Sequence, residues 1–196
     1  MDGDTRDTIR AVALELFSTR GFDQTSLREI AERVGLTKAS LYYHYSSKQA
    51  LLIAVVEPVL TGWRDIADDT ATLAHTSANV RQVVARCLDV LLRNRAVAGI
   101  FQRDPAGVAV VAGALWEDML ELSRRLYTWL AGPAASPAEQ LRAVAAMEVL
   151  GAALTSGTYL KEEISEAEAR AVLLDAAMDV LRVSAEPEAS GMRKSG

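Results

Sequence analysis

The feature that most constrains this chain is a run of helix start and stop signals over residues 26–48. Ser26 is followed three residues later by Glu29, a capping-box pattern that begins a helix. Gly35 suits the left-handed conformation that ends a helix, and Thr37 is a plausible N-cap for a second one. These signals predict two short helices joined by a tight turn.

Apolar side chains recur at helical spacing along the rest of the chain, and no alternating strand pattern is present. Ser46 with Gln49 is a second capping-box pattern, which predicts a long helix from Ser47. Pro58 lies inside that helix and is expected to kink or break it. We therefore expect an all-α fold of about nine helices. The predicted helices span residues 4–20, 26–35, 37–45, 47–69, 79–95, 105–131, 137–160 and 165–183.

The single cysteine and the lengths of the apolar runs indicate the cellular compartment of the chain. Cys87 is the one cysteine, so an internal disulfide framework is impossible and a reducing compartment is expected. The N-terminus is acidic and polar, unlike a signal peptide. No apolar run reaches the ~18 residues that a membrane helix needs. We expect a cytoplasmic protein with no membrane partner.

The net charge of −5 argues against nucleic acid, but its distribution is uneven. Residues 1–50 hold seven basic and seven acidic side chains, whereas residues 51–196 hold fourteen and nineteen. Residues 25–50 are mildly positive, with four bases and two acids. A second basic window covers residues 81–103, where Arg outnumbers acid. Charge alone therefore does not locate a nucleic-acid site.

Patterns for catalysis or metal binding are missing from the sequence. It has two histidines and one cysteine, without metal-ligand spacing and without a glycine-rich phosphate loop. The pairs Glu162-Glu163 and Asp68-Asp69 are adjacent, so on a helix their carboxylates point apart. We expect no enzyme, no metal and no cofactor.

The two short helices carry groups that can contact double-stranded DNA. A helix-turn-helix places the start of its second helix against base edges in the major groove, and small side chains there allow a close approach. Helix N-termini can hold phosphates with backbone amides and a nearby cation. The candidate DNA-binding residues are Ser26, Thr37, Lys38, Ala39, Ser40, Tyr42, Tyr43, His44 and Lys48.

Helix spacing sorts the side chains of the second short helix. Leu41 and Tyr45 are four residues apart and share the face that we expect to be buried. Tyr42 and His44 are then the expected exposed pair, with Tyr43 intermediate. The alternative is that the aromatic residues belong to the core and the charges are merely solvated.

Residues 11–52, AVALELFSTRGFDQTSLREIAERVGLTKASLYYHYSSKQALL, resemble the DNA-binding domain of the tetracycline-repressor (TetR) family of bacterial transcription regulators. The resemblance rests on the Phe before the glycine turn, Thr-Ser-x-x-x-Ile-Ala, Val-Gly-Leu and Leu-Tyr-x-His-Tyr-x-x-Lys. Ala39 replaces a glycine often seen there, and Tyr45 replaces the usual phenylalanine. The resemblance implies a homodimer that binds a near-palindromic operator and is released by a small-molecule effector.

This resemblance divides the chain into a helix-turn-helix domain at 1–47, a ligand-binding and dimerisation domain at 48–184 and a disordered polar tail at 185–196. Large side chains of the second domain could line an effector pocket, although each could equally be ordinary core. The pocket candidates are Trp63, Cys87, Phe101, Trp116, Met119 and Tyr127.

The last two predicted helices could pair with those of a second copy in a four-helix bundle, because the final helix shows a heptad-like seam. They could also be ordinary buried helices of a monomer. The candidate dimer residues are Leu150, Leu154, Ala171, Leu174, Met178 and Leu181. The most direct interpretation is a ligand-responsive repressor, and the alternative is a constitutive or protein-controlled repressor.

Overall fold

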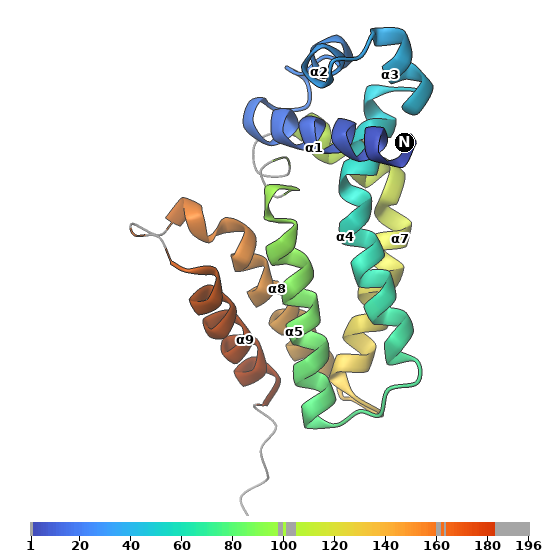
Figure 1. The fold of residues 1–196 in the computed structure, drawn as a ribbon. Helices are drawn as coiled ribbons and strands as arrows, with labels where there is room; N and C mark the ends of the chain where they lie inside the picture. Colours follow the sequence, from blue (N-terminus) through green and yellow to red (C-terminus); the bar gives the residue numbers. More distant parts are fainter. Residues whose placement is uncertain (1, 98–99, 101–104, 160–161, 163, 183–196) are drawn as a thin grey trace, which may run out of the picture.

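The computed structural model describes residues 2–97, 100, 105–159, 162 and 164–182, which form helices and their connections (Figure 1). No strand occurs in these ranges, and the expected all-α fold is confirmed. The predicted helix ends agree with the observed ones within about two residues. The tail expected to be disordered lies outside the described residues. The helices are α1 (Asp2–Arg20), α2 (Leu27–Val34), α3 (Lys38–His44), α4 (Lys48–Thr70), α5 (Ser77–Arg93), α7 (Pro105–Ala131), α8 (Pro137–Tyr159) and α9 (Glu166–Arg182).

The N-terminal unit gathers α1, α2 and α3 at one end of the molecule (Figure 1). Phe17 and Phe22 pack their rings with centroids 5.4 Å apart. Ile9, Ile30 and Leu41 bring one fully buried side chain from each of the three helices. Burial of such side chains is worth about 1.5–3 kcal/mol each, which is what holds three short helices together.

The predicted caps fix the frame of α2 and α3. The Ser26 hydroxyl accepts a hydrogen bond from the Glu29 amide at 3.1 Å, and the Thr37 hydroxyl accepts one from the Ser40 amide at 3.0 Å. Gly35 ends α2 with φ at +78°, a conformation that costs other residues about 1–2 kcal/mol. These three residues set the turn between the two helices as the sequence predicts.

The start of α4 differs by one residue from the prediction. Ser47, rather than Ser46, is its N-cap, and the Ser47 hydroxyl accepts a hydrogen bond from the Ala50 amide at 3.0 Å. The helix also runs unbroken through Pro58, so a break there was a wrong expectation. Pro58 is exposed, and the buried side chains of Val56 and Leu60 anchor the helix on either side of it.

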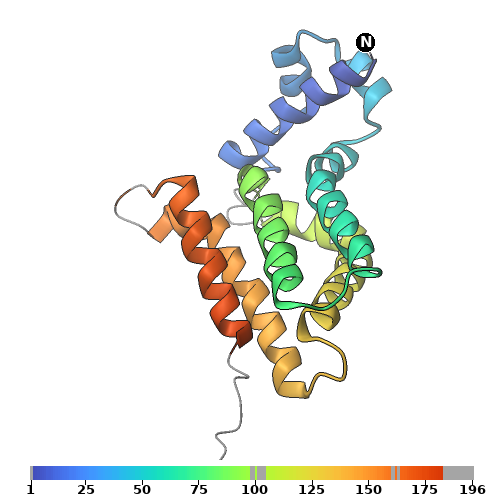
Figure 2. The same ribbon diagram turned by 60° about the horizontal axis from the view of Figure 1, so that its bottom comes forward.

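The C-terminal domain is a bundle of α5, α7, α8 and α9, joined to the N-terminal unit by α4. Helix α4 contacts α1 at its N-terminal end and packs against α5 and α7 further along. Helices α8 and α9 run antiparallel, lie side by side in both views and pack on α5 (Figures 1 and 2). Within the described ranges, no helix is both long and apolar enough to cross a membrane.

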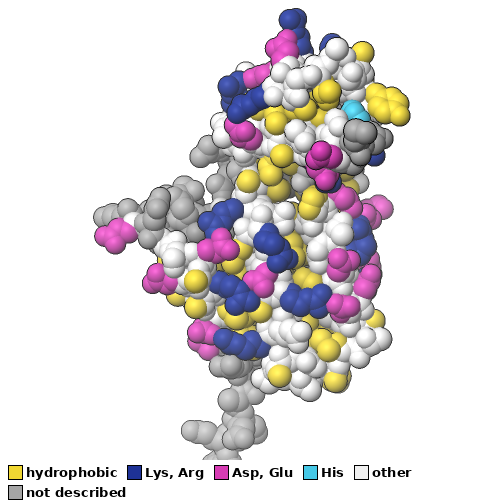
Figure 3. All heavy atoms as spheres, in the orientation of Figure 1, with side chains coloured by type: hydrophobic (Ala, Val, Ile, Leu, Met, Phe, Trp, Pro, Cys, Tyr) yellow, Lys and Arg dark blue, Asp and Glu magenta, His cyan; other side chains and the backbone are white. Residues whose placement is uncertain are grey.

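The second basic window lies on and just after α5, and three of its arginines are paired with acidic side chains. Figure 3 shows dark blue and magenta side chains next to one another over this part of the bundle. The ion pairs connect α5 and the residues after it to α4 and α9, so the window serves packing between helices. The pairs are Arg81 with Asp175 at 2.9 Å, Arg86 with Asp69 at 2.7 Å and Arg95 with Glu166 at 3.0 Å.

Candidate nucleic-acid interface

The exposed face of α3 is centred on Tyr43. Leu41 is fully buried and Tyr45 is 7% exposed, as predicted, whereas Tyr43 is 81% exposed. A helix turns about 100° per residue, so Tyr43 points about 180° away from the midpoint of Leu41 and Tyr45. Tyr42, at 44% exposed, and His44, which is half-buried, lie about 80° to either side of that midpoint. The expectation that Tyr43 would be intermediate was therefore wrong, because it is the outermost side chain of this helix.

The first turn of α3 presents two kinds of group. Lys38 and Ala39 are exposed, and Ala39 shares the outer face with Tyr43 one turn later. The Lys38 ammonium lies 5.7 Å from the centroid of the Tyr42 ring, so these two form one edge of the helix. The Ser40 hydroxyl lies 3.0 Å from that of Thr37 and is therefore partly committed to the cap.

The end of α3 is tied to the start of α1. The Arg6 guanidinium donates to the His44 carbonyl at 3.1 Å and lies 5.4 Å from the centroid of the Tyr45 ring. The Tyr45 hydroxyl donates to the Arg6 carbonyl at 3.4 Å. Burial raises the pKa of Tyr45, so its hydroxyl stays protonated and remains a donor. These contacts hold α3 rigidly, as a helix that reads base edges requires.

A surface groove of about 470 Å³ lies beside this edge of α3. Its walls come from the α1–α2 turn, from α3 and from the start of α4, so the N-termini of α2 and α4 open onto the same groove. Backbone amides and the helix dipole favour an anion at each of these ends. Among the lining residues are Ser26, Arg28, Lys38, Tyr42, Ser47 and Lys48.

Lys48 lies in this groove, but its ammonium is directed inward. It donates to the carbonyls of Phe22 at 2.8 Å and of Thr25 at 3.1 Å, and it lies 4.2 Å from the centroid of the Phe22 ring. In this structure its hydrogen bonds go to the α1–α2 turn, and the expectation that Lys48 holds a phosphate stays a prediction. Its role here is to fasten that turn to the start of α4.

The arginines of the N-terminal unit are also engaged. Three of them form ion pairs with glutamates of the same unit and Arg10 pairs with Asp7, so the field of these four over the groove is small. A nucleic-acid contact at this surface would therefore rely on Lys38, the helix ends and the tyrosines. The pairs are Arg20 with Glu29, Arg28 with Glu32 and Arg33 with Glu15.

Residues 9–55 match the family model described as bacterial regulatory proteins, tetR family. The match covers most of α1, the capped pair α2 and α3, and the start of α4. The N-terminal unit is thus similar to the DNA-binding part of TetR-family regulators.

The relatives in sequence are similar over this N-terminal part. The HTH-type transcriptional regulator RutR of Escherichia coli K12 is 38% identical over 80 residues, which are 39% of this chain and 38% of RutR. IcaR of Staphylococcus aureus strain Newman, the HTH-type negative transcriptional regulator of the biofilm operon icaADBC, is 48% identical over 46 residues. Those residues are 24% of this chain and 25% of IcaR. The chain thus spans less than half the length of these curated relatives.

Solved structures extend the likeness in fold to nearly the whole chain. AmtR of Mycobacterium smegmatis has a TM-score of 0.73 at 22% identity, over 92% of this chain and 87% of AmtR. A transcriptional regulator of Aquifex aeolicus VF5 has a TM-score of 0.68 at 21% identity, over 91% of this chain and 98% of its own. The C-terminal bundle therefore shares its architecture with TetR-like regulators, while its ligand chemistry is not given by the fold.

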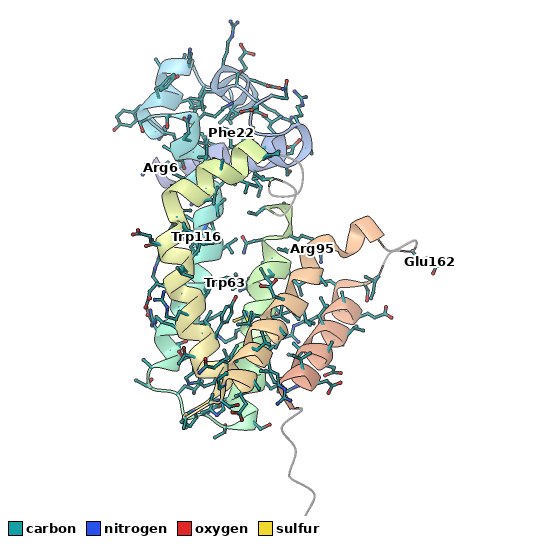
Figure 4. All side chains as sticks on the ribbon, turned by 180° about the vertical axis from the view of Figure 1, so that it is seen from behind. Arg6, Phe22, Trp63, Arg95, Trp116 and Glu162 are labelled. Carbon is teal, nitrogen blue, oxygen red and sulfur yellow. The ribbon has the colours of Figure 1, made fainter. Side chains whose placement is uncertain are left out.

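A cavity of about 140 Å³ lies between α4 and the C-terminal bundle. Two of the pocket candidates, Trp63 and Met119, line it, together with Leu154 from the set expected at a dimer interface. Figure 4 shows where Trp63 lies among the helices of the bundle. The lining residues are Val56, Val59, Leu60, Trp63, Leu91, Asn94, Val97, Met119 and Leu154.

The other pocket candidates lie elsewhere. Cys87 is fully buried away from the lining of this cavity, and burial raises the pKa of its thiol to about 12. Tyr127 is half-buried and also outside the lining. Trp116 is 61% exposed on α7, so its assignment to a pocket wall is corrected (Figure 4). Phe101 lies outside the described residues.

The heptad-like seam of α9 faces its own protomer. Leu174 and Met178 are 5% and 2% exposed, and Leu150 on α8 is fully buried, so they cannot also meet a partner. These three assignments to a dimer interface are therefore corrected. Of the remaining candidates, Leu154 and Leu181 are half-buried and Ala171 is exposed.

The exposed apolar side chains of this helix pair are different ones. Leu141 on α8 is 68% exposed and Val172 on α9 is 57% exposed. Sequence reasoning missed both, because neither falls on the heptad-like seam. A second apolar stripe on each helix could have indicated them, because Ala145 follows Leu141 and Ala176 follows Val172, each at a spacing of four residues.

Proposed function

We propose that this chain is a transcriptional repressor that acts in the cytoplasm, binds a near-palindromic operator as a homodimer and is released by a small effector. The observation that carries the proposal is the rigidly held face of α3, where Ala39 and Tyr43 project beside a groove that collects two helix N-termini. The printed description of IcaR as a negative regulator supports repression rather than activation.

The geometry supports a role on DNA for each of these exposed groups. With α3 in the major groove, the small side chain of Ala39 allows a close approach and Tyr43 projects furthest toward the bases. Tyr43 can contact a thymine methyl or a phosphate, and Lys38 can reach a guanine edge or a phosphate. The groove beside Lys38 suits a backbone phosphate, because the N-termini of α2 and α4, whose dipoles favour an anion, open onto it.

A second copy of the chain would align two such helices. Two recognition helices related by a two-fold axis read half-sites about one helical turn of DNA, ~34 Å, apart. Leu141 and Val172 are large apolar side chains exposed on the antiparallel pair α8 and α9, and we assign them to the contact between copies. A two-fold contact would place the same stripe of each copy against the other.

Helix α4 is the route by which an effector would act. Val56, Leu60 and Trp63 of this helix line the cavity, and the other end of the helix contacts α1. A ligand that binds more tightly to one orientation of α4 than to another shifts the population toward that orientation. Because α4 contacts α1, this changes the distance between the two N-terminal units of a dimer, and so their fit to DNA. The alternative, a constitutive or protein-controlled repressor, needs no cavity, so the cavity favours control by a small molecule.

Binding to DNA is tested by fluorescence anisotropy with the region upstream of the gene itself. Operator affinity should fall as salt rises, because cations are released from the phosphates. Tyr43→Ala should weaken binding about tenfold, as expected for loss of one good base or phosphate contact. Trp116→Ala is the matched control, because it removes an exposed aromatic ring from α7. Equal affinities of Tyr43→Ala and wild type would show that α3 is not the reading helix.

The dimer contact is tested by light scattering. Val172→Glu places a charge on the proposed interface, where desolvation should convert the dimer to a monomer at micromolar concentration. Leu120→Glu on α7 is the control, because Leu120 is a comparably exposed apolar side chain at 45%. A monomeric wild type, or a dimeric Val172→Glu with a monomeric Leu120→Glu, would contradict the proposed interface.

A further inference from the structure

Trp63 lines the cavity, and its indole nitrogen is a buried donor. Among the described residues, no acceptor lies within hydrogen-bonding distance of Trp63 Nε1, although the atom is shielded from solvent. The other tryptophan whose indole meets the bundle, Trp129, donates to the Leu73 carbonyl at 3.3 Å. A buried donor without a partner is costly and rare, and a bound group that accepts its hydrogen bond accounts for it.

The size of the cavity limits what that group can belong to. Its volume is about 140 Å³. An engineered apolar cavity of about 150 Å³ in another protein stays dry and binds benzene. A single substituted ring therefore matches the space, and a fused polycyclic drug does not.

The walls also limit the charge of the ligand. None of the described residues that line the cavity is Asp, Glu, Lys, Arg or His. Asn94 is the polar residue among them besides Trp63, and its amide nitrogen is committed to the Val90 carbonyl at 2.8 Å. A charged ligand would lose its hydration without finding a counter-ion, which is strongly unfavourable.

We infer that the effector is a small neutral molecule of single-ring size, apolar apart from one hydrogen-bond acceptor such as a ketone, aldehyde or ether oxygen. A shift of the Trp63 indole, whose Nε1 is shielded from solvent in this structure, lets the acceptor take the hydrogen of that nitrogen. The ligand's ring fills the space bounded by Val56, Leu60, Leu91 and Met119. That this molecule controls DNA binding rests on the proposed function, whereas its binding to the cavity does not.

The test compares two molecules of the same shape. Acetophenone carries a carbonyl oxygen where α-methylstyrene carries a methylene group, and benzoate adds a charge. Calorimetry on the DNA-free protein should give dissociation constants for the first two and no measurable binding of benzoate. Trp63→Phe should reduce the preference for acetophenone over α-methylstyrene roughly 3- to 10-fold, the worth of one hydrogen bond. Trp116→Phe, on the outer side of α7, should leave that preference unchanged.

A second measurement does not depend on the variant. The Nε1–H resonance of Trp63 in the wild-type protein should move downfield with acetophenone and not with α-methylstyrene. The inference is overturned if neither neutral molecule binds, if benzoate binds as well as acetophenone, or if Trp63→Phe retains the full preference. Anisotropy with operator DNA separates the two proposals: ligand binding without any DNA binding would refute the repressor and leave the ligand class standing.

Discussion

Replacing Lys48 by methionine should destabilise the protein, because the structure makes this lysine a fastener of the N-terminal unit. Methionine keeps most of the apolar stem and removes the ammonium that donates to Phe22 at 2.8 Å and to Thr25 at 3.1 Å. Hydrogen bonds from a charged donor contribute about 1.5–3 kcal/mol each, and a cation over an aromatic ring adds about 0.5–1 kcal/mol.

Water can reach part of this half-buried site, so the low end of those ranges applies. We expect a loss of about 3.5 kcal/mol in the free energy of unfolding, which corresponds to a fall in Tm of about 7–14 °C for a chain of this size. Lys38→Met is the matched control, because Lys38 lines the same groove but is exposed, and its Tm should stay within about 1 °C of wild type.

Differential scanning calorimetry and operator titrations at several salt concentrations distinguish the two possible roles of Lys48. A phosphate contact contributes about one unit to the slope of log affinity against log salt and little to Tm. If Lys48→Met melts with the wild type and lowers that slope as Lys38→Met does, the lysine binds phosphate and the inward geometry does not describe its function.

Three further predictions follow from burial and close packing. Leu41→Ala should lower the free energy of unfolding in urea by about 2–5 kcal/mol, because Leu41 is fully buried, whereas Tyr43→Ala should lower it by under about 0.5 kcal/mol. Equal losses would mean that α3 is rotated about its axis relative to this structure. Burial raises the pKa of Cys87 to about 12, so its thiol should resist a disulfide reagent at pH 8 until urea unfolds the chain. The same pKa shift stabilises the folded state below pH 9, and that stabilisation is lost as pH rises from 9 toward 12. Gly62→Ala should destabilise by about 1–3 kcal/mol despite better helix propensity, because its Cβ would lie 2.8 Å from Val90 Cγ2; Val90→Ala should relieve part of this loss in a double-mutant cycle, and additive losses would place the clash elsewhere.

Local chemistry made α2 and α3 predictable. The hydroxyls of Ser26 and Thr37 and the glycine at 35 act within a few residues of sequence, so reading them in order gives the helix frame. The frame correctly placed Leu41 and Tyr45 in the core. The exposure of Tyr43 could also have been predicted from the sequence. The helix face opposite the midpoint of Leu41 and Tyr45 is the one that carries Tyr43.

Contacts between distant segments were not predictable in the same way. The heptad-like pattern of α9 is the same whether the helix packs on α5 and α8 of its own chain or on a second copy. The burial of Leu174 and Met178 within the protomer shows that it packs on its own chain. The basic window at 81–103 likewise looked available for nucleic acid until Asp69 and Asp175 were seen beside it. The hydrogen bonds of Lys48 could not be foreseen for the same reason, since its acceptors at Phe22 and Thr25 lie more than twenty residues earlier.

The continuity of α4 has a practical consequence for recombining regulators of this kind. Leu51 and Leu52 are fully buried near the end of α4 that contacts α1, so the hydrophobic core under the DNA-binding helices extends beyond the turn at residue 47. A chimera spliced in that turn would join the interior of one protein to the helices of another. A graft that transfers operator preference intact should instead carry its junction within α4, beyond Val56, and match the side chains there to the new cavity.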